Sequence, residues 1–196
     1  MNRTSRINEN FGLKTLGILG MSLWFLIIMM GFGMAADKEN TLYLETKDGR
    51  VVIEMRPDLA PNHVNRIKEL VRQKFYDGLL FHRVIDGFMV QTGDPNGNGT
   101  GGSGQKLPPE FTSEKHVRGI LSMARAQDPA SADSQFFIML GDSAHLDNQY
   151  TVWGKVVSGM EYVDQIKKGA SSQNGTVTDP DKIITMQVAA DGDESK

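Results

Sequence analysis

The chain has 196 residues, of which 39% are hydrophobic, so it is long enough for one globular domain with a substantial core. Its formal net charge of −3 excludes the concentrated positive charge of a nucleic-acid-binding protein, and we expect no nucleic acid among its partners. The absence of cysteine excludes disulfides, thiol chemistry and a cysteine-based zinc site.

The first 36 residues have the pattern of a signal peptide or a membrane anchor. Residues 16–36 contain no charged side chain, basic residues precede them, and Asp37-Lys38-Glu39 follows. Because small residues surround Ala35 and Ala36, we expect a signal peptide that is cleaved near this point and a periplasmic protein. The alternative is an uncleaved segment that anchors the protein to the inner membrane, since about 20 apolar residues span a bilayer.

Two β-strands are predicted next, at Thr41–Thr46 and Arg50–Met55. Lys47-Asp48-Gly49 separates them, and Asp-Gly between two alternating runs is a strong signal for a β-hairpin. We therefore expect the domain to begin with a hairpin.

An amphipathic helix is predicted after the hairpin. Pro61 suits the first helical position, where its missing N–H is not needed. The apolar residues that follow recur every three or four positions, as on one face of a helix; they are Val64, Ile67, Leu70, Val71 and Phe75. Asp77-Gly78 is the expected end of the helix, and we expect its apolar face to pack over a sheet.

The stretch Leu80–Pro95 combines two short apolar strands with polar side chains. Asp86-Gly87 separates the strands and is typical of a tight turn. Arg83 and Gln91 interrupt the apolar pattern. Because an arginine in an apolar surface needs acceptors for its planar set of N–H donors, Arg83 either forms a structural ion pair or faces a ligand.

The glycine-rich segment Gly93–Gly104 has the appearance of a phosphate-binding loop, but its details exclude one. Gln105 stands where such a loop has lysine, and Pro108-Pro109 follows where a helix would begin. A wide loop whose backbone comes close to a bound peptide agrees better with so many glycines.

The rest of the chain predicts further short strands and a second helix. The strands are expected at Ile120–Ala124, Gln135–Leu140, Tyr150–Val157 and Lys182–Ala189, and the helix at Met160–Ile166. Short strands at near-regular spacing with two helices favour a β-barrel or a β-sandwich.

The sequence gives no support for metal or nucleophilic chemistry. The four histidines include no pair at metal-ligand spacing, so we expect no metal site. Ser122, Ser131 and Ser134 belong to no motif that would pair them with a base. Asp94 is expected to hold the glycine-rich loop through its carboxylate.

The order of the motifs resembles that of the cyclophilins, which are peptidyl-prolyl cis-trans isomerases. The stretch from Phe81-His82-Arg83 to Gly93-Asp94 matches the family signature at every position. Further matches follow in the family's order; they are Asn98–Gly102, Gly119–Ala124, Ser134–Ile138, Leu146-Asp147 and Val152–Val156. The resemblance covers the chain from about Thr41 to Ala189.

The resemblance implies the fold and the domain organisation. The expected fold is mainly β, a closed eight-stranded antiparallel β-barrel with two capping α-helices. The expected isomerase domain spans residues 37–191, after the segment 1–36 and before a polar tail at 192–196.

The resemblance also implies the activity and the residues that carry it. The expected enzyme is a peptidyl-prolyl cis-trans isomerase that acts on proline-containing peptides and unfolded proteins and uses no cofactor. The implied catalytic residues are Arg83, Phe88 and Gln91. The implied substrate-binding residues are His82, Met89, Gly99, Ala124, Arg125, Ala126, Gln135, Phe137, His145, Leu146 and Tyr150. Of these, His82 has a second interpretation, as a structural histidine beside the site whose ring nitrogens have hydrogen-bond partners. The alternative function is a chaperone-like module that binds proline peptides with little turnover.

Three positions depart from the commonest eukaryotic pattern of the family. His145 replaces the usual tryptophan, Tyr150 the usual histidine and Arg125 the usual asparagine. Because the first two change the rim of the binding pocket, the resemblance implies only weak cyclosporin binding. The departures resemble those of bacterial members, in agreement with an exported protein. A membrane is an expected partner only if the first segment stays uncleaved.

Overall fold

The computed structural model describes residues 37–192. The segment 1–36, which carries the export prediction, and the end of the predicted tail lie outside the described residues. The strands are β1 (Thr41–Glu45), β2 (Arg50–Met55), β3 (Arg83–Ile85), β4 (Met89–Thr92), β5 (Ile120–Met123), β6 (Phe136–Met139), β7 (Val152–Ser158) and β8 (Thr185–Val188), and the α-helices are α2 (Pro61–Arg72) and α3 (Met160–Gln165). Within residues 37–192, no helix has the length and apolar character needed to cross a membrane.

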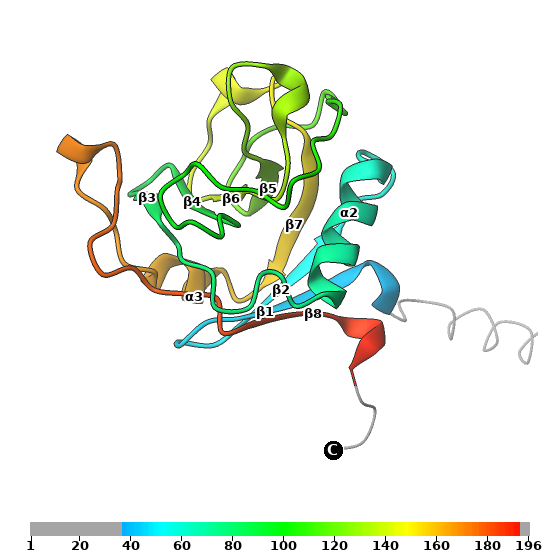
Figure 1. The fold of residues 1–196 in the computed structure, drawn as a ribbon, viewed down its shortest axis with the longest axis horizontal. Coiled ribbons are helices and arrows are strands. Elements are labelled where there is room, and N and C mark those ends of the chain that lie inside the picture. Colours follow the sequence, from blue (N-terminus) through cyan, green and yellow to red (C-terminus); the bar gives the residue numbers. More distant parts are fainter. Residues whose placement is uncertain (1–36, 193–196) are drawn as a thin grey trace, which may run out of the picture. The chain divides into compact units, whose positions relative to one another are not determined.

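The strands form one antiparallel sheet of eight, in the order β3-β4-β6-β5-β7-β2-β1-β8 (Figure 1). In the described part of the chain the two end strands, β3 and β8, do not pair with each other, so the sheet is an open half-barrel. The prediction of a closed barrel is therefore wrong. The eight antiparallel strands and the two helices are confirmed.

A segment that precedes β8 occupies the edge of β3 that would meet it: the Val84 N–H donates to the Gly175 carbonyl at 2.8 Å, and Arg83 forms an isolated antiparallel bridge with Thr176. Gly78, before β3, has a φ of 80°, and Asp179, before β8, has a φ of 53°, so neither approach is fully extended. Strand β8, at Thr185–Val188, is shorter than the predicted Lys182–Ala189. The approaches still meet, because the Phe81 N–H donates to the Asp181 carbonyl at 2.9 Å. An isolated antiparallel bridge between Leu80 and Lys182 thus takes the place of a ladder between β3 and β8.

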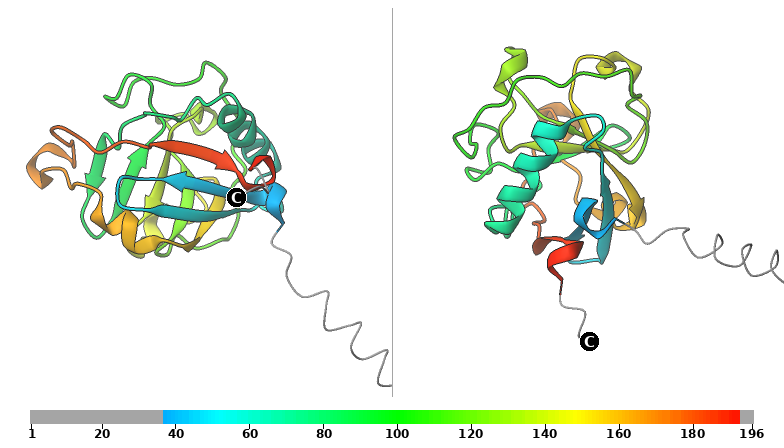
Figure 2. Two further views of the ribbon diagram at one scale, coloured as in Figure 1. Left: turned by 90° about the horizontal axis from the view of Figure 1, so that it is seen from below. Right: turned by 90° about the vertical axis from the view of Figure 1, so that its right-hand side faces the viewer.

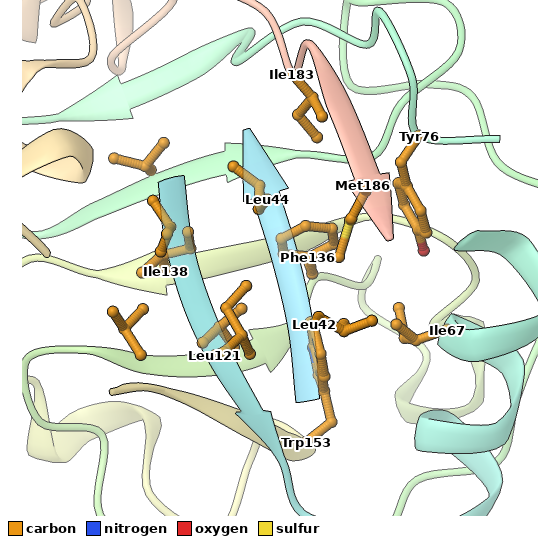
Figure 3. Packing of buried hydrophobic residues seen from close by; sticks show 14 of the residues in the cluster. Leu42, Leu44, Ile67, Tyr76, Leu121, Phe136, Ile138, Trp153, Ile183 and Met186 are labelled. Atoms are coloured by element: carbon orange, nitrogen blue, oxygen red, sulfur yellow. The ribbon is translucent and has the colours of Figure 1, made fainter. Parts of the chain in front are cut away.

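The predicted first hairpin is confirmed. Tyr43 of β1 stands opposite Val52 of β2 in an antiparallel register. Alternate residues of both strands, such as Leu42 and Ile53, are fully buried inside the half-barrel. Figure 3 shows this core, in which Ile67 of α2 points toward the strand that carries Leu42.

Helix α2 covers one side of the core, as predicted, and its apolar face is buried. It ends at Arg72, earlier than the predicted Asp77-Gly78. Lys74 adopts a left-handed backbone with a φ of 57°, which turns the chain away from the helical path. Phe75 still packs against the core from this turn.

The predicted second helix is α3, which lies at the far side of the domain from α2 (Figures 1 and 2). Tyr162 of α3 packs against the turn of the first hairpin. A Cβ at Gly49 would lie 2.5 Å from the Tyr162 ring, so only glycine fits at this contact.

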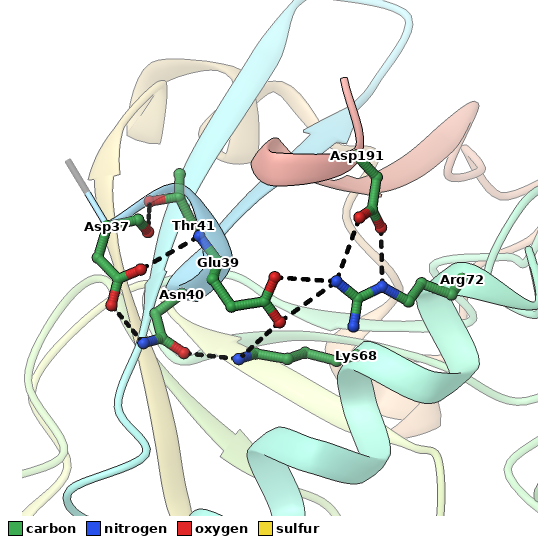
Figure 4. A network of polar contacts seen from close by, with 7 residues as sticks. All are labelled: Asp37, Glu39, Asn40, Thr41, Lys68, Arg72 and Asp191. Atoms are coloured by element: carbon green, nitrogen blue, oxygen red, sulfur yellow. Dashed lines mark hydrogen bonds and ion pairs between the residues drawn. The ribbon is translucent and has the colours of Figure 1, made fainter. Parts of the chain in front are cut away.

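Polar contacts join both ends of the described chain to the last turn of α2 (Figure 4). Arg72 Nη2 lies 2.9 Å from Glu39 Oε2, just before β1, and Arg72 Nε lies 2.8 Å from Asp191 Oδ2, after β8. Lys68 Nζ lies 3.3 Å from Glu39 Oε1 and donates to Asn40 Oδ1 at 2.7 Å. The network holds the beginning and the end of the domain side by side.

A second apolar cluster covers the outer face of the part of the sheet formed by β4, β6, β5 and β7. Its buried members are Met89, Ile120, Phe137, Met139, Leu146 and Val152. Because this cluster lies opposite the main core, every residue of β5 and β6 is buried. The polar side chains of the candidate site lie on this outer face.

Candidate functional site

One row of side chains crosses the outer face of the sheet. Arg83 of β3 stands opposite Gln91 of β4, and Gln91 stands opposite Phe137 of β6. Phe137 in turn stands opposite Ser122 of β5. Residues directly opposite each other in a sheet point to the same face. The strand registers therefore bring a cation, an amide and an aromatic ring side by side.

A cavity of about 360 Å³ opens over this row, and we call it the aromatic lobe. Its lining residues are Arg83, Phe88, Met89, Gln91, Ala124, Arg125, Phe137, Leu146, Tyr150 and Asn174. The Phe137 and Tyr150 rings meet edge to face, with centroids 5.7 Å apart. The lobe is thus an apolar, largely aromatic hollow with cations at its edge.

A second cavity of about 280 Å³ adjoins the first, and we call it the glycine lobe. Its lining residues are Gln91, Gly99, Thr100, Gly101, Gly102, Lys106, Ala124, Arg125, Ala126, Ser131, Asp133 and Gln135. Gln91, Ala124 and Arg125 line both cavities. The two lobes therefore form one groove, long enough for several residues of an extended peptide.

Arg83 is half-buried and is held along one edge of its guanidinium group. Its Nε donates to the Asn174 carbonyl and its Nη2 to Asn174 Oδ1, both at 3.0 Å. Its Nη1 donates to Gln91 Oε1 at 3.1 Å. Burial lowers the pKa of Arg83 from its ordinary value, but an arginine remains charged at neutral pH. One N–H on Nη1 and one on Nη2 are left without a partner in residues 37–192, and Arg83 lines the groove.

Asn174 is a functional residue that the sequence reasoning missed. It follows β7 and α3 in the chain and has a left-handed backbone with a φ of 53°, which turns both its carbonyl and its side chain toward Arg83. Asparagine tolerates this conformation better than most residues. Asn174-Gly175 is a visible turn signal, but the sequence alone does not place that turn beside Arg83.

Amide side chains continue the contact from Arg83 into the glycine lobe. Gln91 Nε2 donates to Gln135 Oε1 at 3.0 Å. Gln135 Nε2 donates to the carbonyls of Gly99 and Gly101, at 3.1 and 2.8 Å. This series of hydrogen bonds fixes the position of the groove wall relative to the guanidinium group.

Asp94 holds the glycine-rich loop, as predicted. Its carboxylate accepts hydrogen bonds from the backbone N–H groups of Asn96, Asn98, Gly99 and Gly101. Burial by itself would raise the pKa of Asp94, but these N–H donors outweigh it and the pKa is lowered. The loop is therefore tied down by an ionised carboxylate beneath it.

Ser122 lies beside a base, a contact that no sequence motif indicated. Its Oγ lies 2.9 Å from Nε2 of His116, and Nδ1 of His116 lies 3.2 Å from Oδ1 of Asp147. Ser122 and His116 are fully buried, so no substrate reaches this hydroxyl. The His116 ring stacks on Phe137 at a centroid distance of 6.4 Å. The three polar residues therefore support the floor of the aromatic lobe.

Hydrogen bonds, neighbouring charges and burial together determine the protonation states of Asp147 and His116. The N–H groups of His116 and the Lys115 ammonium lower the pKa of Asp147 to about 2. Burial lowers the pKa of His116, and Asp147 opposes this only in part. His116 is therefore neutral at neutral pH, with Nδ1 donating to Asp147 and Nε2 accepting the Ser122 hydroxyl.

The structure brings together most, but not all, of the predicted site residues. Twelve of the fourteen line the groove. His82 lies beneath the loop, where a Cβ at Gly99 would be 4.0 Å from its Nε2, and its ring nitrogens have no hydrogen-bond partner in residues 37–192. His82 does not line the groove, and its assignment as a substrate-binding residue stays a prediction.

His145 is exposed beside the groove rather than in its lining. Its ring faces that of Phe88 at a centroid distance of 5.8 Å.

In the described part of the chain, no group of three or more histidine, aspartate or glutamate side chains is placed to hold a metal ion.

Sequence comparison relates this architecture to known proteins. The family described as cyclophilin type peptidyl-prolyl cis-trans isomerase/CLD matches residues 41–188. A probable peptidyl-prolyl cis-trans isomerase of Brucella suis is 57% identical over 169 residues, which are 80% of this chain and 86% of that protein. The human peptidyl-prolyl cis-trans isomerase-like 3 is 42% identical over 130 residues, which are 64% of this chain and 80% of that protein.

Solved structures have the same fold. A cyclophilin from Hirschia baltica matches with a TM-score of 0.71 and 27% identity, over 81% of this chain and 77% of that one. A cyclophilin-type isomerase from Cryptosporidium parvum, crystallised in the presence of the dipeptide Ala-Pro, matches with a TM-score of 0.69 and 28% identity. That match covers 76% of this chain and 98% of the other.

Proposed function

The chain belongs to the cyclophilin-type peptidyl-prolyl cis-trans isomerases, and from this premise we propose that its groove is the active site and Arg83 its catalytic residue. The aromatic lobe holds the proline ring, and the glycine lobe holds the adjoining residues of the peptide. The enzyme rotates the bond that precedes proline.

This reaction needs no nucleophile. Rotation breaks the amide resonance of the X-Pro bond, and without a catalyst it takes tens to hundreds of seconds over a barrier of roughly 20 kcal/mol. In the twisted state the proline nitrogen regains a lone pair, which a fixed donor stabilises. An interaction made only in this state lowers the barrier, and about 1.4 kcal/mol corresponds to a tenfold change in rate.

Arg83 is positioned to supply such a donor. Asn174 and Gln91 hold three of its N–H groups, which leaves one on each terminal nitrogen for the substrate. A donor that is already oriented needs no reorganisation when the bond twists. Phe88, Met89, Phe137 and Leu146 offer the apolar surface against which a proline ring packs.

The observation that carries the proposal is the placement of Arg83. Its half-buried guanidinium group lies at the edge of an apolar hollow and is bound by neutral acceptors, Asn174 and Gln91. A merely structural arginine is expected to pair with a carboxylate. The arrangement therefore favours a role toward a ligand.

A rate measurement separates this proposal from its rival, a chaperone-like module that binds proline peptides with little turnover. The full-length protein is added to a short X-Pro-Phe peptide in a chymotrypsin-coupled assay, in which only the trans form is cleaved. We expect the slow cis phase to accelerate in proportion to enzyme concentration. Peptide binding without acceleration would establish the rival function instead.

The proposal extends to the cellular setting. We expect the substrates to be exported, unfolded polypeptides, whose folding is limited by X-Pro isomerisation, and the enzyme to act in the periplasm. The uncharged segment 16–36, preceded by basic residues, supports this. N-terminal sequencing of protein from the native host tests it. A start near Ala36 or Asp37 agrees with export, whereas an intact segment in the membrane fraction would establish the anchored form.

A further inference from the structure

Two arginines of the domain differ from the others because they do not pair with a carboxylate. Of the seven arginines in residues 37–192, five pair with a carboxylate; these are Arg50, Arg56, Arg66, Arg72 and Arg118. In the same range, Arg83 and Arg125 have no carboxylate within salt-bridge distance, and both line the aromatic lobe. The two arginines that lack a carboxylate partner in this range are thus both in the groove.

Arg125 lies where the two lobes meet. Its Nε and Nη2 donate to the Gln149 carbonyl at 3.2 and 3.0 Å, and its Nη1 donates to the Ala126 carbonyl at 2.9 Å. Its guanidinium carbon lies 4.7 Å above the centre of the Tyr150 ring. These neutral contacts fix the position of the cation but leave its charge without a counterion.

The rest of the groove lining adds to the positive charge. Lys106 lines the glycine lobe, where the one carboxylate among the lining residues is Asp133. Asp133 already accepts hydrogen bonds from Ser103 and Gly104. The lining thus carries three cations and one anion, although acidic residues exceed basic ones, 24 to 21, in the whole chain.

We infer that Arg125, with Lys106, makes the enzyme select proline peptides that carry a carboxylate side chain next to the proline. The inference deepens the proposed function and rests on it. A peptide that extends from the aromatic into the glycine lobe must pass Arg125, because Arg125 lines both. A glutamate beside the proline then supplies the missing counterion, whereas a lysine there meets a like charge.

The test compares peptides that differ in one charge. Exchange NMR gives the isomerisation rate of pentapeptides with Glu, Gln or Lys either directly before or directly after the proline, with catalytic amounts of the full-length protein. At one of the two positions, we expect kcat/KM for Glu to exceed that for Gln by roughly threefold and that for Lys by roughly tenfold at low salt. Because these charges are solvent-accessible, roughly 0.5 M salt should reduce the preference.

Variants assign the preference to its residues. In Arg125→Gln the ratio of the Glu to the Lys rate should fall by about threefold or more, and Lys106→Gln should lower it by a smaller factor. Because each ratio is taken within one variant, it is independent of any change in overall activity. Lys155→Gln is the matched control, since Lys155 is an exposed cation on β7 outside the groove; the ratio should stay at the wild-type value.

The outcomes separate the inference from the proposed function. Equal rates for Glu, Gln and Lys peptides at both positions, or a preference that is unchanged in Arg125→Gln, would overturn the inference and leave an isomerase. No acceleration of any peptide by the wild type would overturn the proposed function, and the inference with it.

Discussion

Asn174 accepts two hydrogen bonds from Arg83. Its carbonyl and its Oδ1 each accept one, at 3.0 Å, from the same edge of the guanidinium group. The two residues are 91 positions apart in the chain. Because arginine has a long side chain, holding two of its nitrogens in this way removes most of its conformational freedom before a substrate arrives. Asn174 is thus a positioning residue for the proposed catalysis.

Asn174→Gly tests this relationship. Glycine keeps the left-handed backbone and the carbonyl acceptor but removes Oδ1, so the fold should survive while Arg83 loses one of its two fixed contacts on that edge. We expect kcat/KM on an X-Pro peptide to fall by roughly tenfold, as for the loss of one hydrogen bond to a charged group.

The matched control is Asn148→Gly. Asn148 has a similar left-handed backbone, with a φ of 59°, and is exposed. Its substitution should leave the rate near that of the wild type. Equal rates in Asn174→Gly and Asn148→Gly would show that the Asn174 side chain does not position Arg83.

Stability should fall as the pH is lowered below about 6.5, the ordinary pKa of histidine. Burial lowers the pKa values of His82 and His116 in the folded protein. The unfolded chain therefore binds more protons below pH about 6.5, and each histidine reduces stability by at most about 1.4 kcal/mol per pH unit until its folded pKa is reached. Urea unfolding at a series of pH values measures this loss.

Histidine variants identify its source. His82→Gln and His116→Gln should each reduce the slope of stability against pH, because burial lowers the pKa of both histidines in the folded protein. A slope that is identical in both variants and the wild type would mean that the buried histidines do not contribute.

Activity should respond weakly to pH and not at all to chelators. Bond rotation transfers no proton, and the proposed donor, Arg83, stays charged throughout the physiological range. We expect kcat/KM to vary by less than about twofold between pH about 6 and 8, the range in which only an unperturbed histidine titrates. Loss of activity in EDTA, restored by a divalent metal, would reveal a cofactor that this account lacks.

Cyclosporin should inhibit the enzyme only weakly. Where related cyclophilins have a tryptophan, His145 offers less apolar area beside Phe88 and no indole N–H. The loss should weaken binding by about ten- to a hundredfold, and His145→Trp should recover much of it while changing turnover less. Titration of the activity with cyclosporin measures both proteins. Tight inhibition of the wild type, or no gain in the variant, would contradict this.

The sequence predicted the individual strands of the site better than it predicted how those strands pair. Two short apolar runs separated by Asp86-Gly87 identified the strands, and Arg83 and Gln91 stand out because they interrupt those runs. The register that places Arg83 opposite Gln91, and Gln91 opposite Phe137, depends on pairing between strands. Local pattern does not specify that pairing, and only the family resemblance grouped these residues.

The features that the sequence did not reveal are contacts between distant segments. Asn174 reaches Arg83, and Asp147 reaches His116, by side-chain hydrogen bonds that have no signature in composition or spacing. The open edge between β3 and β8 likewise depends on Gly175 and Thr176, which pair with β3 from far along the chain. Each of these features requires the folded arrangement.

The most direct test of the central claim is kcat/KM for an X-Pro peptide with the wild type, Arg83→Ala and Arg83→Lys, with circular dichroism to confirm that each variant is folded. Arg83 belongs to neither apolar cluster, so both variants should fold. We expect about a hundredfold loss in Arg83→Ala, the scale of removing one oriented donor to a transition state. Arg83→Lys should also be impaired, because an ammonium does not reproduce the planar fork. A folded Arg83→Ala variant with the wild-type rate would contradict the account.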